Sequence, residues 1–350
     1  MNKFATLIFI VCILQLKAFG QGQVSNVSFG DAYEAYRDSL KNTPYPWRMP
    51  VMGSKIRKLG FDIPYPNGIM LNVAYSNQLL TLDDVNVGFD PNNMTNVDGL
   101  ARFRSISSDV FATTIRYDFW LLPFLNFSAI TGRINATTNV HLGLPFDLKF
   151  QTESEGTMVG WGAVIAGGFG PFVMSSDMTM GWTYVGNLSA PSRSIIAGIR
   201  IGHMIRFKER PDRNLVLLVG GQYLGLNPQS DGRADLEKLV GITPEGKEDA
   251  LQQINAWYDN LSESEQDIFG DLYDGLSNWL GNGESTYIYY DFKKRLYYPW
   301  SINAGFNFQI NKRYALTAMY SFLGSRTQIV GGLSYRFGWK GKNMLSGVTL

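Results

Sequence analysis

The sequence predicts an all-β fold, a transmembrane antiparallel up-and-down β-barrel of about ten strands. Segment after segment alternates between apolar and polar residues with a period of two, which is typical of strands with two different faces. The polar positions are mostly small or uncharged, and the apolar sets begin or end in Trp, Tyr or Phe. A soluble β-sandwich also alternates, but its outer faces would be rich in Lys and Glu. Aromatic strand ends and small polar inner positions instead match the interface girdles and the crowded lumen of a membrane barrel.

The composition is consistent with many half-exposed strands. Aromatic residues make up 14% of the 350 residues, and glycine occurs 37 times. The formal net charge is +1, so no strong electrostatic field indicates a nucleic-acid partner.

The N-terminus has the pattern of a secretory signal peptide over residues 1–20. Lys3 gives it a basic start, residues 5–16 are mostly apolar, and Ala18 and Gly20 are small residues where a signal peptidase would read them. The one cysteine, Cys12, lies inside this run, and residues 8–11 lack the small residues expected before a lipidation site. We therefore expect a mature chain with no thiol chemistry and no disulfide, exported to the outer membrane of a Gram-negative cell.

The strands can be placed in order along the mature chain. We expect them at residues 69–78, 111–119, 125–134, 157–167, 172–184, 195–207, 215–224, 300–310, 314–322 and 328–339. Two further alternating segments, residues 144–150 and 287–292, would raise the count to twelve if both crossed the membrane.

The connections between these strands alternate in length, as in bacterial barrels with short periplasmic turns and longer outside loops. The short connectors are residues 122–123, 168–171, 208–213 and 311–312. The longer or more variable ones are residues 79–109, 135–156, 186–193, 227–299 and 323–326. This parity predicts that both termini of a barrel at residues 69–339 are periplasmic.

Residues 229–284 interrupt the strand pattern and predict an extracellular helical hairpin. Ser262 followed by Glu265 is a capping-box pattern, and apolar residues then repeat at helical spacing. Between Asp231 and Glu284 there are 13 acidic and 3 basic residues, a net of ten negative charges. The hairpin could pack on itself and on the barrel rim with a solvated acidic face, or act as a gate or docking surface for a cationic or metal-bridged partner. Its acidic residues lack the glycine and the loop spacing of an EF-hand.

Residues 21–68 precede the first strand and remain open to two interpretations. A short helix is expected at residues 31–41, and Pro44, Pro46 and Pro50 then favour an extended path. The segment could rest in the periplasm or enter the lumen as a plug.

The two histidines, His141 and His203, are the only candidates for a His-dependent enzyme. His141 falls in an outside loop, but no Ser or carboxylate stands at a diagnostic spacing from it. His203 falls on the apolar face of its strand, where an interfacial role is expected. No nucleotide loop, zinc spacing or haem motif is present, so we predict no enzyme activity, no cofactor and no metal site.

A set of charged residues on the small or polar faces is more informative, because charges inside a narrow barrel are costly unless they are paired or hydrated. We expect them to line the lumen, either as ion pairs that hold the barrel shut or as a polar constriction. They are Arg116, Asp118, Asp177, Arg200 and Arg336.

A series of motifs resembles a family of uncharacterised Gram-negative outer-membrane barrels. The matching pieces are WLLPFLN at residues 120–126, AGGFG at 166–170, YPW at 298–300, INKRY at 310–314, FLGSR at 322–326 and YRFGW at 335–339. The resemblance implies the same barrel, membrane and place for the helical insertion, but no activity. Residues 340–350 depart from it, because the chain continues as a tail past the aromatic end of the last strand.

Three functions are consistent with these expectations. The first is a narrow passage for small solutes, gated by the acidic hairpin. The second is a closed barrel that serves as a surface display, binding or adhesion platform. The third is an outer-membrane hydrolase, which would require His141. Outer-membrane lipid is the expected partner, and the oligomeric state stays open.

Overall fold

The computed structural model describes residues 31–98, 102–144, 148–186, 188, 190–207, 209–227, 229–235, 244–282 and 287–340. The predicted signal peptide, and the tail after residue 340, lie outside these residues.

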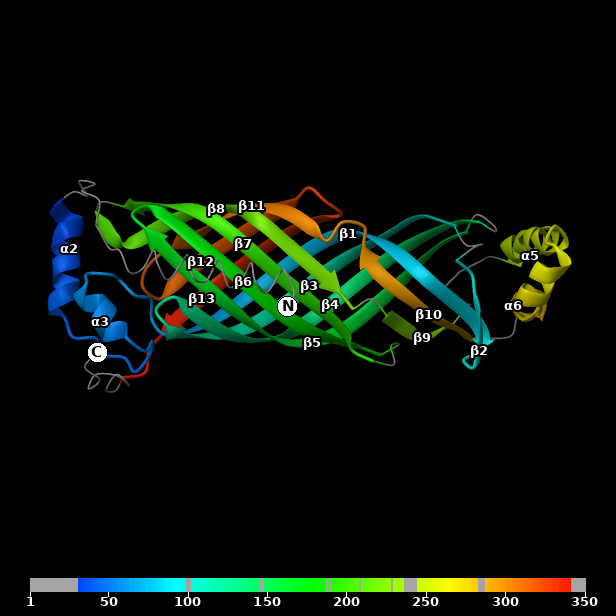
Figure 1. The fold of residues 1–350 in the computed structure, drawn as a ribbon, viewed down its shortest axis with the longest axis horizontal. Helices are drawn as coiled ribbons and strands as arrows, with labels where there is room; N and C mark the ends of the chain where they lie inside the picture. The colour runs from blue at the N-terminus through cyan, green and yellow to red at the C-terminus, as the bar shows by residue number, and fades with distance from the viewer. Residues whose placement is uncertain are drawn as a thin grey trace.

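The predicted ten-stranded barrel is confirmed (Figure 1). Each strand pairs antiparallel with its neighbours in the ring, and the last strand pairs with the first from Asn67↔Phe337 to Gln78↔Arg326, which closes the sheet. The ring consists of β1 (Asn67–Asp90), β3 (Arg102–Leu122), β4 (Leu125–Leu144), β5 (Leu148–Phe169), β6 (Phe172–Val185), β7 (Ser192–Phe207), β8 (Arg210–Leu226), β11 (Trp300–Gln309), β12 (Tyr314–Phe322) and β13 (Arg326–Phe337).

The two faces of the barrel are distributed as in a membrane protein. On β1 the outward side chains are apolar and exposed: Ile69 is 46% and Leu71 48% exposed. The inward Ser76 is only 3% exposed. Aromatic side chains stand outward toward both rims, among them Tyr75 and Trp300 at one end and Phe172 at the other. An apolar outer belt with aromatic margins around a polar interior is stable in lipid and unfavourable in water. The chain is therefore a transmembrane barrel.

The length of the belt fits a bilayer. The antiparallel pairing of β1 with β13 runs from Asn67 to Gln78, and tilted strands of about 9–11 residues are sufficient to cross the hydrocarbon core. Among the described residues, no helix is long and apolar enough to cross a membrane.

The alternative of twelve strands is wrong. Of the first segment, Leu144 ends β4 and residues 148–150 begin β5, while residues 145–147 lie outside the described residues. Residues 287–292 belong to β10 (Tyr287–Leu296), which pairs with β1 from Leu80 to Gly88. Because β1 continues past the point where β13 begins, its free edge accepts β10 outside the ring. β9 (Gln229–Asp235) pairs with β10, and β2 (Asn93–Asn96) pairs with β1. We call β1 residues 80–90 together with β2, β9 and β10 the strand extension.

The predicted helical hairpin forms and packs on the strand extension. Its helices are α5 (Pro244–Asp259) and α6 (Glu263–Asn282), beyond the long-loop end of the barrel in Figure 1. Two apolar clusters join them to the extension, one around Phe269 and Val85 and one around Ile254 and Trp279. One half of the capping box at the start of α6 is present, because the Glu265 carboxylate accepts hydrogen bonds from the Ser262 backbone N–H and hydroxyl, at 2.9 and 2.6 Å. The backbone N–H of Glu265 donates to the Ser262 carbonyl at 2.9 Å. The predicted insertion differs in one detail, since its first residues form β9.

The segment before β1 lies across the opposite end of the barrel (Figure 1). It contains α2 (Asp31–Asn42) and α3 (Gly53–Lys58). Its backbone bonds to the end of β3, where Val51 N–H donates to Leu121 O at 2.9 Å and Trp120 N–H donates to Pro66 O at 2.8 Å. We call residues 31–66 the end cap, because they cover the short-turn end.

Candidate functional site

The inward face of the barrel is built so that long side chains can cross it. A Cβ added at Gly68 would lie 2.7 Å from a carboxylate oxygen of Asp118, and one added at Gly332 would lie 2.3 Å from the end of Met70. Small residues on one strand therefore leave the volume that charged and long side chains of other strands occupy. All five charged residues predicted from the sequence lie at inward positions. Four of them form two ion-paired groups, and Arg116 lies between these groups.

The first group lies near the short-turn end. Arg336 on β13 forms an ion pair with Asp118 on β3, with 2.9 Å between Nη2 and Oδ1. The same carboxylate oxygen accepts a hydrogen bond of 2.7 Å from Asn126. Arg336 also donates from Nε to the carbonyl of Tyr65 in the end cap, at 3.1 Å, and its guanidinium lies 5.9 Å from the ring centre of Trp120. This ion pair therefore connects the barrel wall to the end cap.

The second group lies on the other side of the lumen. Arg200 on β7 forms an ion pair with Asp177 on β6 and donates from Nε to the Oδ1 of Asn303 on β11, at 3.1 Å. Asn303 is 1% exposed. A Cβ at Gly198 would lie 3.1 Å from the Asp177 carboxylate, so the glycine makes room for the pair.

Arg116 lies between the two groups and forms no ion pair within the part of the chain that the structure describes. It donates to Asn126 Oδ1 at 3.3 Å, while its buried Nε has no hydrogen-bond partner. It is close enough to Asp118 and Asp177 to be attracted by both. Electrostatic attraction through Arg116 therefore joins the two ion pairs, so that three arginines and two aspartates form one charged network inside the barrel.

Sequence reasoning missed Arg326, the first residue of β13. Its side chain is 3% exposed and reaches across to β8 and β11, where Nη2 donates to Gln222 at 2.6 Å and to Ser301 at 3.2 Å. Among the described residues, no carboxylate pairs with it. The sequence pattern places Arg326 in the connector at residues 323–326, yet the alternation from Gln328 on the polar face, extended by two positions, places it inside.

The two histidines lie apart in the barrel wall. His203 faces outward near the short-turn end, with its ring 5.7 Å from that of Phe172 in an edge-on arrangement. His141 lies on β4, opposite Ser105 and Lys149 in the neighbouring strands. The position of His203 in the wall agrees with an interfacial role.

The end cap is attached to the short turns by charged and aromatic contacts. Asp62 accepts a hydrogen bond from the Tyr36 hydroxyl and lies 3.6 Å from the ammonium of Lys312 in the β11–β12 turn. Burial, together with the charge of Asp62, raises the pKa of Tyr36 well above its usual range. Trp47 forms an isolated antiparallel bridge with Lys340, just after β13. The cap is thus attached at several points around the rim.

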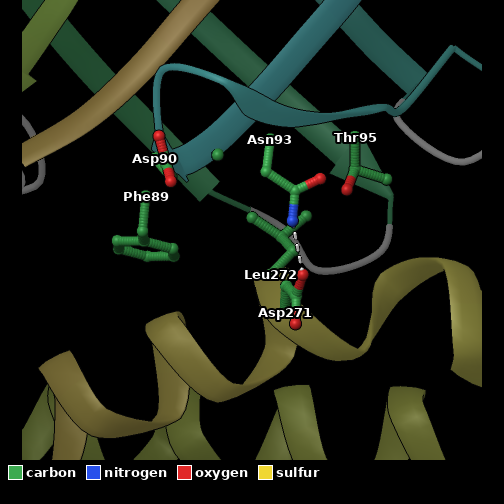
Figure 2. Close-up of a pocket in the computed structure, with 7 residues that line it drawn as sticks. Phe89, Asp90, Asn93, Thr95, Asp271 and Leu272 are labelled. Carbon is green, nitrogen blue, oxygen red and sulfur yellow. Dashed lines mark hydrogen bonds between the residues drawn. The ribbon is translucent and has the colours of Figure 1, made fainter.

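A cavity of about 230 Å³ lies at the opposite end, between β1, β2 and α6. Figure 2 shows Asn93 and Asp271 joined across it, with 2.7 Å between the amide nitrogen and the carboxylate oxygen. Gly88, Phe89, Asp90, Thr95 and Leu272 complete its lining. Among the described residues, no three His, Cys, Asp or Glu side chains are arranged to hold a metal ion.

Comparisons with known proteins found no matching family model and no matching curated protein. Solved structures do match. The translocator domain of the autotransporter NalP from Neisseria meningitidis is 10% identical over 87% of this chain and 93% of its own, with a TM-score of 0.30. An outer membrane channel from Pseudomonas putida F1 is 9% identical over 79% and 97%, with a TM-score of 0.29. The toluene transporter TbuX from Ralstonia pickettii is 8% identical over 78% and 90%, with a TM-score of 0.28. At these identities and TM-scores, none of the matches carries an argument about what this chain does.

Proposed function

We propose that this protein is an outer-membrane barrel that provides a narrow passage for small polar solutes. The barrel, its apolar belt and its polar interior support a place in an outer membrane, the setting in which closed β-barrels span lipid. In this proposal the short turns and the end cap face the periplasm, and the helical hairpin faces outward.

The observation that carries the proposal is the set of polar side chains that cross the lumen. Arg336, Arg200 and Arg326 each reach a partner on a strand that is not their immediate neighbour. A structural core of so narrow a barrel could be filled with apolar side chains, which avoids the desolvation cost of buried charges. Charges that line a pore instead act as a filter, because they replace the hydration of a permeating solute.

The end cap closes the passage at the short-turn end in this proposal, and its movement opens it. A disulfide between positions 47 and 340 tests the role of the cap. Residues in an antiparallel bridge have Cα atoms about 4.5–5.5 Å apart, which is within the range of disulfide bonds. The only native cysteine, Cys12, lies in the predicted signal peptide, so Trp47→Cys/Lys340→Cys would introduce the only pair.

Conductance of the refolded double variant in planar bilayers is then measured under oxidising and reducing conditions. We expect few or no openings when the disulfide is formed, and recovery after reduction. The Trp47→Cys single variant controls for the loss of the Trp47 ring and should not respond to the reductant. Absence of conductance from every form of a folded barrel would contradict the proposal.

The helical hairpin could act as the outer gate or as a display surface. A specific observation favours the second role. The hairpin packs in two apolar clusters, mainly against the strand extension, with Val97 and Phe103 also in contact. Since Asp235 and Tyr287 are directly paired, residues 236–286 can be replaced by a short Gly/Ser turn. Larger or more frequent openings in this variant would make the hairpin a gate. Unchanged conductance would assign it to surface binding.

A further inference from the structure

Lys294 on β10 of the strand extension faces the opposite way from the two basic residues beside it. Lys293 and Arg295 on β10 point to the outer face, where Lys293 pairs with Asp84 and Arg295 with Asp83, the latter at 2.8 Å. Lys294 lies between them on the opposite, inward face and is partly buried. Among the described residues it has no hydrogen bond and no ion pair.

The position of Lys294 continues the line of charges inside the barrel. It pairs with Leu82 on β1, and Arg326 pairs with Gln78 on the same strand. Gln78 and Leu82 are four residues apart on one face, so their positions differ by about 13 Å along the strand. Leu80 and Leu296 lie on the inward face between these two positions, and Gln222 and Ser301 hold the Arg326 guanidinium toward β8 and β11. Both cations therefore border the same part of the long-loop mouth.

The described inward face is cationic even after its ion pairs are counted. Arg200 and Arg336 are paired with Asp177 and Asp118, whereas Lys294, Arg116 and Arg326 lie at inward positions with no ion pair among the described residues, which leaves three inward positive charges without a carboxylate partner. The chain as a whole has a formal net charge of only +1, so these charges are a property of the interior. Positive charges without carboxylate partners in a confined polar space attract anions.

We infer that the long-loop mouth of the barrel, between Arg326 and Lys294, is a binding site for small anions that carry a carboxylate, sulfate or phosphate group. The guanidinium of Arg326 is already positioned by Gln222 and Ser301, and its buried Nε has no hydrogen-bond partner, so it can donate a further hydrogen bond. Lys294 supplies the second charge from the extension. The inference deepens the proposed passage by giving it a solute class, and the binding measurement below does not depend on conduction.

Ion selectivity tests the inference in the conducting state. The ratio of chloride to potassium permeability is obtained from the reversal potential in a KCl gradient. We expect a ratio above one for the native chain and a fall of about tenfold in Lys294→Gln, since a unit charge acts with opposite sign on the two ions. Arg326→Gln should lower it similarly. Lys293→Gln, which removes the neighbouring outward lysine, is the matched control and should leave the ratio unchanged.

Equal effects of Lys294→Gln and Lys293→Gln, or a native ratio at or below one, would overturn the inference. If no variant conducts, the proposed passage fails and the anion site is decided by equilibrium dialysis of the detergent-solubilised full chain against radiolabelled sulfate. Saturable binding that Lys294→Gln weakens and Lys293→Gln does not would support the site. No saturable binding to the native chain would refute it.

Discussion

Removing the carboxylate of Asp118 should destabilise the barrel far more than removing an exposed carboxylate of the strand extension. In Asp118→Ala, Arg336 loses its ion pair and Asn126 loses an acceptor. At the observed separation of 2.9 Å, Coulomb's law with an effective dielectric constant of about 20 gives a gross attraction of about 6 kcal/mol. Desolvation of the charges offsets part of this attraction, and breaking one side of a buried pair typically costs about 3–5 kcal/mol.

We expect a loss of about 3 kcal/mol, because Arg336 keeps its hydrogen bond to Tyr65 O and can recover some hydration. The control is Asp83→Ala, whose pair with Arg295 has side chains 43% and 69% exposed, against 6% and 18% for Asp118 and Arg336. An exposed pair of this kind contributes at most about 1 kcal/mol. The assay is urea unfolding in phospholipid vesicles, followed by tryptophan fluorescence and by the gel mobility of unheated samples. Equal losses in the two variants would refute the reasoning that the luminal pair is buried.

Three further outcomes are expected. Gly220→Ala should cost about 1–3 kcal/mol, because its Cβ would lie 2.0 Å from Ile199 O, whereas Gly221→Ala meets nothing within 4 Å and should be neutral; equal urea midpoints would contradict the close packing of β7 and β8. Hydrogen bonds from Ser262 lower the pKa of Glu265 below its usual 4.5, so the contribution of the carboxylate to the hairpin is fully present above that pH and is lost as the pH falls through the lowered value. Glu265→Gln should therefore reduce the acid sensitivity of hairpin proteolysis, and an unchanged pH profile would argue against the capping box. Protease added to intact cells should cut the hairpin and spare the strands, whereas cleavage only after permeabilisation of the outer membrane would reverse the proposed orientation.

The barrel could be predicted because the sequence pattern of each strand and each short turn lies within a few consecutive residues. Alternation along each strand fixes which residues face lipid, and the lengths of the turns fix the order and pairing of neighbours. The positions of Arg116, Asp118, Asp177, Arg200 and Arg336 on the inward face follow from the same parity.

What could not be predicted depends on contacts between distant segments. The partners of the luminal charges lie on other strands, so nothing near Arg200 in the sequence indicates Asn303. β1 extends well beyond the predicted segment, and its pairing with β10 across more than two hundred residues could not be deduced from either strand alone. The choice between a plug and an external position for residues 31–66 likewise depended on contacts of Val51 and Asp62 with the ends of the strands.

The inside-outside alternation of the wall in lipid is the central claim, and single cysteines on β13 test it most directly. Leu333→Cys places a label at a position that is 50% exposed on the outer face, and Ser334→Cys places one at the next position, which is 8% exposed on the inner face. Each variant is labelled with the same environment-sensitive fluorophore and refolded in vesicles of brominated phospholipid, which quench fluorophores in contact with the acyl chains. The account predicts strong quenching at position 333 and little at position 334. Equal quenching at both positions, or none at either, would contradict a transmembrane barrel with this register.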